Sequence, residues 1–279
     1  MFEIISKEEL AKDMTKLTVN APVIAKKAKA GQFVTLMAQE CGERIPLTLA
    51  DWDKIKGSIT LIFQKVGYTT KILGAMHSGD NIPHILGPLG HPTEIAKLGT
   101  VVCIGGGVGV AEVYPVSRAF REAGNRVIGI IGARSQELLI LEKEMQESCA
   151  ELFVTTDDGS YGRQGLVIDV LKELFAIIEK STHTKFPELV YCIGPVPMME
   201  AVAKFTKDFR VKTLVSLNPI MVDATGMCGS CRCRVGEKTI FGCVDGPDFD
   251  GHQVDFAELK ARLALFKNQE QSLEGKIHE

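Results

Sequence analysis

The sequence has few of the features that place a protein in a membrane or on a nucleic acid. No apolar run approaches the roughly 18–20 residues that span a bilayer. The formal net charge is only −3, so no charge excess points to nucleic acid or to an anionic membrane surface. The segment that begins at Met1 has no basic stretch followed by an apolar core, and therefore does not resemble a signal peptide. Together these absences favour a cytoplasmic, globular protein.

Cysteine is the residue whose placement is most informative. A chain without a secretory leader is expected to keep its 8 cysteines reduced rather than in disulfides. Four of them are scattered and are interpreted as small hydrophobic residues: Cys41, Cys103, Cys149 and Cys192. The other four fall within a short stretch near the C-terminal end: Cys228, Cys231, Cys233 and Cys243. Thiolates gathered on one loop bind soft metal ions, and this spacing favours a [2Fe–2S] cluster, which moves single electrons.

The hydrophobic patterns predict an antiparallel β-barrel domain, an α/β domain with a parallel sheet and a C-terminal subdomain that holds the cysteine loop. In residues 1–98, alternating runs such as 14–20 and 58–64 are separated by Gly and Pro, as in a small barrel. In residues 99–211, continuous apolar strands alternate with helices, one of them expected over 136–148, which is typical of a parallel sheet. Residues 212–279 hold the cysteine loop and a C-terminal helix.

Glycine-rich segments follow several predicted strands. Gly105–Gly109 lies between a buried strand and a helix, where glycines let the backbone approach a pyrophosphate. Asp157–Gly162 and Gly194–Pro195 follow two later strands, and the carboxyl ends of parallel strands meet at one edge of a sheet. In the barrel, Arg44–Thr48 and Gly67–Thr70 are candidates for further phosphate contacts. The alternatives for these segments are ordinary turns, a surface arginine and a helix cap.

These pieces, in this order, resemble the ferredoxin–NADP⁺ reductase superfamily, in which a flavin-binding barrel precedes a nicotinamide-binding α/β domain. The appended cysteine loop resembles that of the electron-transfer subunits of type B dihydroorotate dehydrogenases. Four strings are more similar still to the small (alpha) subunits of NADH-dependent reduced ferredoxin:NADP⁺ oxidoreductases, also called sulfide dehydrogenase beta subunits: residues 42–48, 105–115, 158–162 and 245–255. The resemblance covers nearly the whole chain.

The resemblance implies which residues hold the two nucleotides. For FAD it implies Arg44, Pro46, Leu47, Thr48, Gly67, Thr69 and Thr70, with the Thr48 hydroxyl near flavin N5 as the catalytic position. For NAD(P) it implies Gly105, Gly106, Gly107, Gly109, Asp158, Gly159, Gly194 and Pro195. Many members carry a cysteine directly before this Gly-Pro turn. Here Ile193 holds that place, and strand alternation points Cys192 to the opposite face, so no catalytic role is expected for it.

The choice of coenzyme stays open between NADH and NADPH. Arg134 and Ser135 end the second predicted strand of the α/β domain, where an acidic residue would bind the ribose 2′-hydroxyl of NAD. An arginine and a serine there suit a 2′-phosphate, whereas the resemblance implies NADH.

Two sets of cluster ligands also stay open. The resemblance implies Asp223, Cys228, Cys231 and Cys243, with aspartate in place of the first cysteine of the dihydroorotate dehydrogenase pattern. The rival set replaces Asp223 by Cys233, and the softness of thiolate favours it. Cys231 and Cys233 are too close in sequence to bracket a two-iron core comfortably, which favours Asp223. Structural Zn²⁺ is a third interpretation of the cysteine spacing.

The resemblance finally implies an oxidoreductase subunit, in which hydride passes between nicotinamide C4 and flavin N5 and the cluster relays single electrons. The implied partner is a larger subunit of the glutamate synthase small-subunit type, with its own FAD and [4Fe–4S] clusters, acting on ferredoxin and NADPH. The resulting heterodimer would carry out flavin-based electron bifurcation. The alternatives are the electron-transfer subunit of dihydroorotate dehydrogenase B and, from another class, a non-catalytic, metal-stapled nucleotide sensor.

Overall fold

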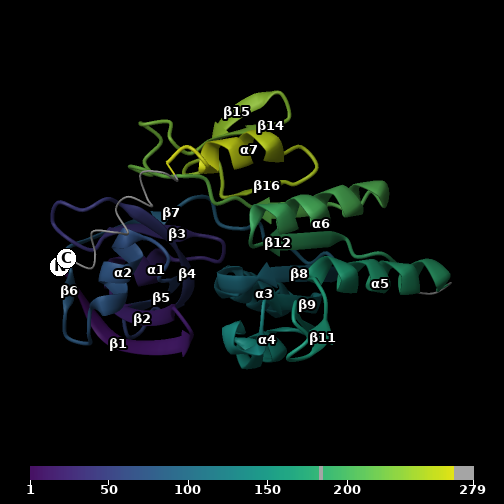
Figure 1. The fold of residues 1–279 in the computed structure, drawn as a ribbon, viewed down its shortest axis with the longest axis horizontal. Coiled ribbons are helices and arrows are strands. Elements are labelled where there is room, and N and C mark those ends of the chain that lie inside the picture. The colour runs from purple at the N-terminus through teal and green to yellow at the C-terminus, as the bar shows by residue number, and fades with distance from the viewer. Residues whose placement is uncertain (182–184, 267–279) are drawn as a thin grey trace. The chain divides into compact units, whose positions relative to one another are not determined.

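The chain forms two compact units (Figure 1). A computed structural model describes residues 1–181 and 185–266. Unit 1 comprises residues 1–92, 218–247 and 254–279, and unit 2 comprises residues 93–217 and 248–253. The domain boundaries expected at residues 98 and 211 stay predictions, and the end of the third expected part lies outside the described residues. No helix in the described ranges is long and apolar enough to cross a membrane.

Unit 1 begins with a seven-stranded antiparallel sheet that forms a near-closed barrel, as the sequence predicted, in the order β6-β1-β2-β5-β4-β3-β7. Its strands are β1 (Phe2–Ala11), β2 (Met14–Asn20), β3 (Phe33–Met37), β4 (Ile45–Asp53), β5 (Ser58–Gln64), β6 (Asn81–Ile82) and β7 (His84–Leu89). Alternation sends every second side chain inward. Leu17 therefore pairs with Leu61, and Val19 with Ile59, in a core where all four are 0% exposed. Two short helices, α1 (Pro22–Lys27) and α2 (Tyr68–Ala75), belong to the same unit.

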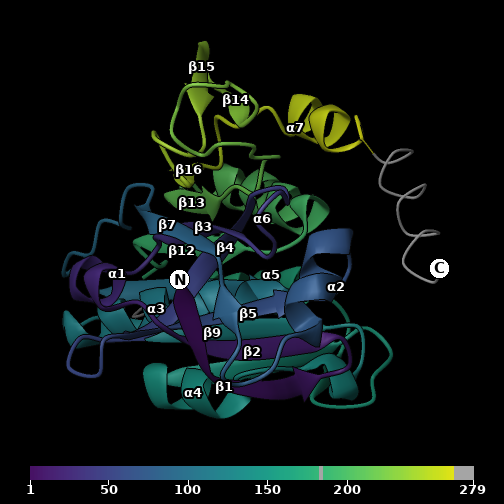
Figure 2. The same cartoon turned by 90° about the vertical axis from the view of Figure 1, so that its left-hand side faces the viewer.

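The cysteine-rich segment of unit 1 is a β-hairpin packed against a helix (Figure 2). Strands β14 (Arg232–Val235) and β15 (Lys238–Phe241) are antiparallel, and α7 spans Phe256–Leu263. The hairpin turn contains Gly236 at a φ of 59°, a left-handed conformation that glycine adopts without steric cost. Asp255 caps α7, because its carboxylate accepts a 2.9 Å hydrogen bond from the Glu258 backbone N–H.

Unit 2 is a second seven-stranded sheet, in the order β11-β10-β9-β8-β12-β13-β16. Its strands are β8 (Thr100–Gly106), β9 (Arg126–Ala133), β10 (Glu151–Thr156), β11 (Arg163–Gln164), β12 (Leu189–Ile193), β13 (Thr213–Ser216) and β16 (Asp248–Asp250). All neighbouring pairs are parallel except β13–β16, where β16 forms an antiparallel edge. This confirms the predicted parallel sheet.

Helices cover both faces of the unit 2 sheet (Figure 1). They are α3 (Val110–Glu122), α4 (Glu142–Ser148), α5 (Val167–Lys180) and α6 (Val196–Asp208). From β8 the chain passes through α3 to β9 and through α4 to β10, toward one edge of the sheet. It then returns through α5 to β12, on the other side of β8. Because such crossovers are right-handed, α3 and α4 lie on one face and α5 and α6 on the other.

The helix predicted over 136–148 is wrong in its first half. Only a short 3₁₀ turn spans Gln136–Leu138, and α4 begins at Glu142 after Leu141, whose φ is 56°. Between them the chain is extended and buries Ile140 to 3% exposure. The left-handed conformation of Leu141 and the extended conformation of Leu139 separate the two helical segments.

The antiparallel edge strand β16 is fixed by a polar contact in unit 2. The Asp248 carboxylate accepts hydrogen bonds from the Tyr191 hydroxyl at 3.0 Å and from Thr93 Oγ1 at 2.6 Å. Burial raises the pKa of Asp248 above its usual range. Tyr191 and Thr93 are themselves only 1% and 6% exposed, so water does not readily replace this acceptor.

Asp248→Ala should destabilise the protein by about 2–4 kcal/mol, because two largely buried hydroxyl donors lose their acceptor. Asp248→Asn is the control, since its amide oxygen can still accept one of the two hydrogen bonds, and its loss should be smaller. Urea unfolding followed by circular dichroism measures both. An Asp248→Ala variant as stable as the wild type would show that the contact does not hold β16.

Candidate cofactor and metal sites

The structure joins the two predicted FAD segments of the barrel. Arg44 is exposed just before β4, and Thr48 is half-buried on β4, paired with Phe33 of β3. Thr69, in the first turn of α2, donates a 2.6 Å hydrogen bond to the Glu43 carboxylate. The two segments, 26 residues apart, therefore meet at the α2 N-terminus. Sequence reasoning missed Glu43, whose only signal was its position next to Arg44.

Gly67 and Thr70 form the N-terminal cap of α2. The Thr70 hydroxyl accepts a hydrogen bond from the Gly67 backbone N–H and donates one to the Gly67 carbonyl, both at 3.0 Å. The hydroxyl of Thr70 is thus used within the helix cap, whereas Gly67 leaves open space, since an added Cβ would meet its nearest atom at 3.9 Å. A backbone without a side chain at a helix N-terminus is what a phosphate requires for close approach.

The predicted NAD(P) residues follow four neighbouring strands of unit 2. Gly105 and Gly106 end β8 and Gly107–Gly109 follow it, Arg134 and Ser135 follow β9, Asp158 and Gly159 follow β10, and Gly194–Pro195 follows β12. The chain proceeds from β8 toward β10 on one side and toward β13 on the other. The topological switch point therefore lies between β8 and β12, the place where open α/β sheets bind ligands.

Close packing at this switch point explains three of the glycines. An added Cβ at Gly109 would lie 2.7 Å from the Ile193 carbonyl oxygen, and one at Gly106 would lie 2.5 Å from Met198 Sδ. At Gly194 an added Cβ would lie 3.2 Å from Gly106 Cα. Side chains at these glycine positions would not fit, so the two loops can lie close together.

The loops after β9 and β10 are connected by hydrogen bonds. The Asp158 backbone N–H donates to the Arg134 carbonyl at 3.2 Å, and the Gln136 N–H donates to Ser160 Oγ at 2.8 Å. Ser160 also donates to the Asp158 carboxylate at 2.6 Å, and this contact lowers the pKa of Asp158. Arg134 and Asp158 are exposed, and Ser135 is half-buried beside them.

In the cysteine loop, the structure brings two of the predicted metal ligands into contact. The sulfur atoms of Cys231 and Cys243 are 3.2 Å apart, and both cysteines are free thiols with 3% and 2% exposure. They form an apolar cluster in unit 1 with Phe33, Met221 and Ala224. Burial and the neighbouring Cys231 raise the pKa of the Cys243 thiol to about 12.

The other two predicted ligands, Asp223 and Cys228, are connected through the backbone. The Asp223 carboxylate accepts hydrogen bonds from the Thr225 N–H at 2.8 Å and from the Cys228 N–H at 3.0 Å, which lower its pKa. Cys228 is exposed, and the hydrogen bond between its thiol and the Ser230 hydroxyl lowers its pKa. Within the described ranges, no three His, Cys, Asp or Glu side chains gather closely enough to hold a metal ion.

Cys233 lies in different surroundings from Cys231. It is on β14, paired with Ile240, and its sulfur is 3.6 Å from the Cys231 carbonyl oxygen. Its thiol is 2% exposed and near Arg262 and Glu258 of α7, and burial raises its pKa to about 12. It is not part of the apolar cluster around Cys231 and Cys243.

The donor set fits a soft metal centre. Two buried thiols in contact would repel one another as thiolates, and a metal ion removes both the repulsion and the desolvation cost of their charge. The exposed carboxylate and thiol on the same loop supply two further anionic donors. A near-closed antiparallel barrel followed by a parallel α/β sheet is a ferredoxin reductase-like fold, and the cysteine loop adds a candidate iron–sulfur site to it.

Comparisons with known proteins agree with this class. Residues 218–255 match the iron-sulfur cluster binding domain of dihydroorotate dehydrogenase B. The electron transfer subunit homolog of dihydroorotate dehydrogenase B (NAD(+)) from Thermotoga maritima is 42% identical over 96% of this chain and 92% of its own. The electron transfer subunit from Geobacillus thermodenitrificans is 30% identical over 90% of this chain and 96% of its own.

One solved structure is similar over the whole length. A chain of the NADH-dependent reduced ferredoxin-NADP oxidoreductase, whose structure gave insights into flavin-based electron bifurcation, superposes with a TM-score of 0.93. It is 40% identical, and the match covers 100% of this chain and 98% of that one. The protein therefore belongs to the family of dihydroorotate dehydrogenase B electron transfer subunits and their homologues.

Replacing Gly109 by alanine should destabilise the protein by about 1–3 kcal/mol, because its Cβ would overlap a backbone oxygen that cannot move independently. Gly67→Ala is the matched control: its added Cβ would make only an ordinary van der Waals contact at 3.9 Å, and the loss of a favourable N-cap residue should cost about 0.5 kcal/mol. Urea denaturation compares the two. Equal stability of both variants would contradict the close approach at the switch point.

Proposed function

We propose that this chain is an oxidoreductase subunit that passes electrons between NAD(H), FAD and a [2Fe–2S] cluster, and exchanges them with a larger subunit. The observation that carries the proposal is the occurrence of dinucleotide loops and a thiolate-rich loop in one ferredoxin reductase-like chain. When bound, nicotinamide and flavin exchange hydride, and an iron–sulfur cluster carries single electrons. The chain's own residues bind and orient these groups.

In the barrel, the FAD assignments rest on the joined segments. Arg44 supplies a cation beside the α2 N-terminus, where Gly67 leaves the backbone accessible. Thr69 is 5% exposed and bonded to Glu43, so its role is to hold the two segments together rather than to contact phosphate. Thr48, Pro46 and Leu47 are half-buried on β4, which places a hydroxyl and apolar surface on a rigid strand for the flavin ring.

In unit 2, the pyrophosphate of NAD(H) is assigned to the backbone of Gly105–Gly109. Gly107 has a φ of 57° and open space around it, so a ligand can approach the peptide closely. The loops that hold Arg134 and Asp158 contact each other, and both are assigned to the adenosine side. NADH is the proposed coenzyme because the oxidoreductase that matches over the full length is NADH-dependent.

For the cluster, the proposed ligands are Asp223, Cys228, Cys231 and Cys243. The different surroundings of Cys233, which faces α7, support its exclusion. Carboxylate donates less electron density to iron than thiolate does, so an aspartate ligand is expected to raise the reduction potential of the cluster.

The proposed partner is a larger flavin and [4Fe–4S] subunit of the glutamate synthase small-subunit type, in a bifurcating NADH-dependent ferredoxin:NADP⁺ oxidoreductase. The full-length match to a chain of that enzyme supports it. The second candidate is the electron transfer subunit of dihydroorotate dehydrogenase B, favoured by the family match over 218–255. Co-purification from the native cell separates them, because only the second predicts a dihydroorotate-oxidising partner.

Purified anaerobically, the protein should be yellow-brown, with flavin and iron–sulfur absorbance that NADH bleaches faster than NADPH. Stopped-flow absorbance measures both rates under identical conditions. Faster bleaching by NADPH would reverse the coenzyme assignment. A colourless protein that binds a nucleotide and stoichiometric zinc would support a metal-stapled sensor instead.

Asp223→Cys should lower the midpoint potential of the cluster and change its EPR spectrum, because a thiolate replaces a carboxylate on iron. Cys233→Ser is the matched control and should change neither. Redox titration followed by low-temperature EPR compares them. The opposite pattern, with Cys233→Ser altering both signals, would assign Cys233 as the ligand.

A further inference from the structure

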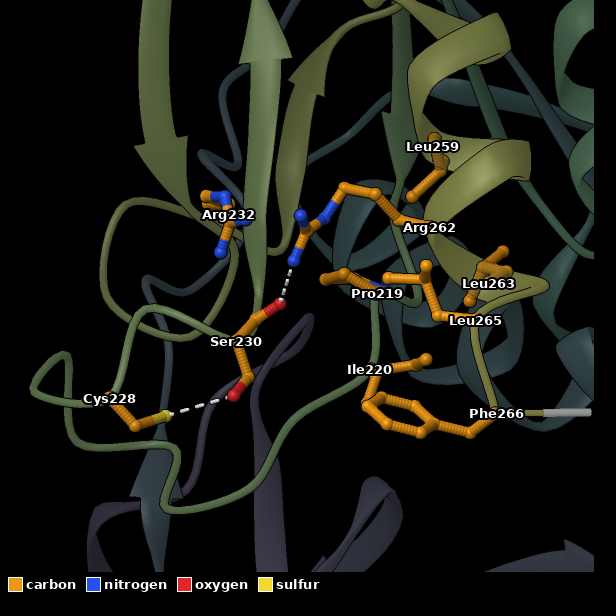
Figure 3. A pocket seen from close by; sticks show the side chains of 10 residues that line it. All are labelled: Pro219, Ile220, Cys228, Ser230, Arg232, Leu259, Arg262, Leu263, Leu265 and Phe266. Carbon is orange, nitrogen blue, oxygen red and sulfur yellow. Dashed lines mark hydrogen bonds between the residues drawn. The ribbon is translucent and has the colours of Figure 1, made fainter. Parts of the chain in front are cut away.

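A cavity of about 250 Å³ separates α7 from the cysteine loop in unit 1 (Figure 3). Its α7 side includes Arg262, and its loop side includes Cys228, Ser230 and Arg232. A polar contact of α7 crosses this space.

Arg262 reaches from α7 to the peptide between two proposed ligands. Its Nη2 donates a 2.8 Å hydrogen bond to the Ser230 carbonyl oxygen, across 32 residues of sequence. Figure 3 shows this bond and a second one on the same residue, between the Ser230 hydroxyl and the Cys228 thiol at 3.4 Å. Ser230 directly precedes Cys231. The Arg262 guanidinium therefore fixes Ser230, which is hydrogen-bonded to the Cys228 thiol and joined to Cys231 by a peptide bond.

Two arginines contact the backbone of this loop. Arg232 donates to the Gly229 carbonyl at 3.2 Å, so two guanidinium groups contact consecutive peptides of the loop. In the described part of the chain, neither arginine forms an ion pair with a carboxylate. Arg262 is half-buried, and a cation removed from water without a counter-charge is costly.

A [2Fe–2S] cluster with three thiolates and one carboxylate provides that counter-charge. Two ferric ions, two sulfides and four anionic ligands sum to a doubly negative charge, and reduction adds one more negative charge. A nearby cation stabilises the reduced form more than the oxidised form, and the attraction is strong where water is partly excluded. The half-buried Arg262 meets this condition better than Arg232, which is exposed.

We propose that Arg262 is a positioning residue for the iron–sulfur site: it holds the Cys228–Cys231 segment through the Ser230 carbonyl, and its charge raises the cluster's reduction potential. This inference rests on the proposed function, since it requires the cluster. Through the planar guanidinium of Arg262, α7 is connected to the cysteine loop and holds it in place.

The test compares three variants of the cluster-loaded, full-length protein. Arg262→Gln removes the charge, Arg262→Lys keeps the charge but loses the planar fork, and Arg234→Gln removes a charge from an exposed position on β14. Two quantities are measured: the midpoint potential by EPR-monitored redox titration, and the rate of iron release to a chelator.

Arg262→Gln should shift the potential to a more negative value and release iron about tenfold faster, a change in free energy of about 1.4 kcal/mol. Arg262→Lys should have the midpoint potential of the wild type but should still release iron faster than the wild type. Arg234→Gln should match the wild type in both measurements. If Arg262→Gln does not fold, the faster iron release of Arg262→Lys still carries the test.

A wild-type protein that contains the cluster, with Arg262→Gln or Arg262→Lys unchanged in iron release, would overturn the positioning role alone. An Arg234→Gln variant that shifts the potential as much as Arg262→Gln would also overturn it, because the effect would then be one of overall charge. A wild-type protein without iron or flavin would overturn the proposed function itself.

Discussion

The contact between the Cys231 and Cys243 thiols is the constraint on which the C-terminal part of the molecule depends. Both are nearly fully buried among apolar side chains, and the Cys231 thiol donates a 3.2 Å hydrogen bond to the Cys243 sulfur without a disulfide between them. Two neutral thiols in such a place contribute little more than small hydrophobic residues would. Two thiolates there would be strongly unfavourable unless a metal centre balanced their charge. We interpret the hairpin, the turn at Asp223 and α7 as the elements that would surround such a centre.

The loops of unit 2 that we propose to bind NAD(H) also depend on close approach, in this case of backbone to backbone. Where the strand order changes direction between β8 and β12, Gly109 lets its loop approach the backbone of Ile193 and Gly194 closely. A loop shaped in this way presents peptide N–H groups rather than side chains, which suits an anionic pyrophosphate. The barrel repeats the arrangement at the start of α2, where Gly67 is open and Thr69 connects the helix to the segment before β4.

Much of the architecture follows from hydrophobic periodicity. Alternation over residues 14–20 and 58–64 predicts paired barrel strands, and the continuous apolar runs around Val102 and Val190 predict strands that are buried on both faces. The glycine loops were predictable because each follows such a strand. The break before α4 was not, because the pattern of residues 136–148 does not show that Ile140 is buried. The contacts of Glu43 and Arg262 were also not predictable, since each joins segments far apart in sequence through an ordinary charged residue.

Low-temperature EPR of the isolated chain after anaerobic addition of NADH shows whether electrons from the nucleotide reach a cluster on the cysteine loop. We expect NADH alone to produce the signal of a reduced [2Fe–2S] cluster, with one cluster and one flavin per chain. We also expect the signal to be absent when Cys231 is replaced by serine although the flavin is retained. A flavin that NADH reduces without any cluster signal in the wild-type chain, or a chain with neither group, would contradict the proposal.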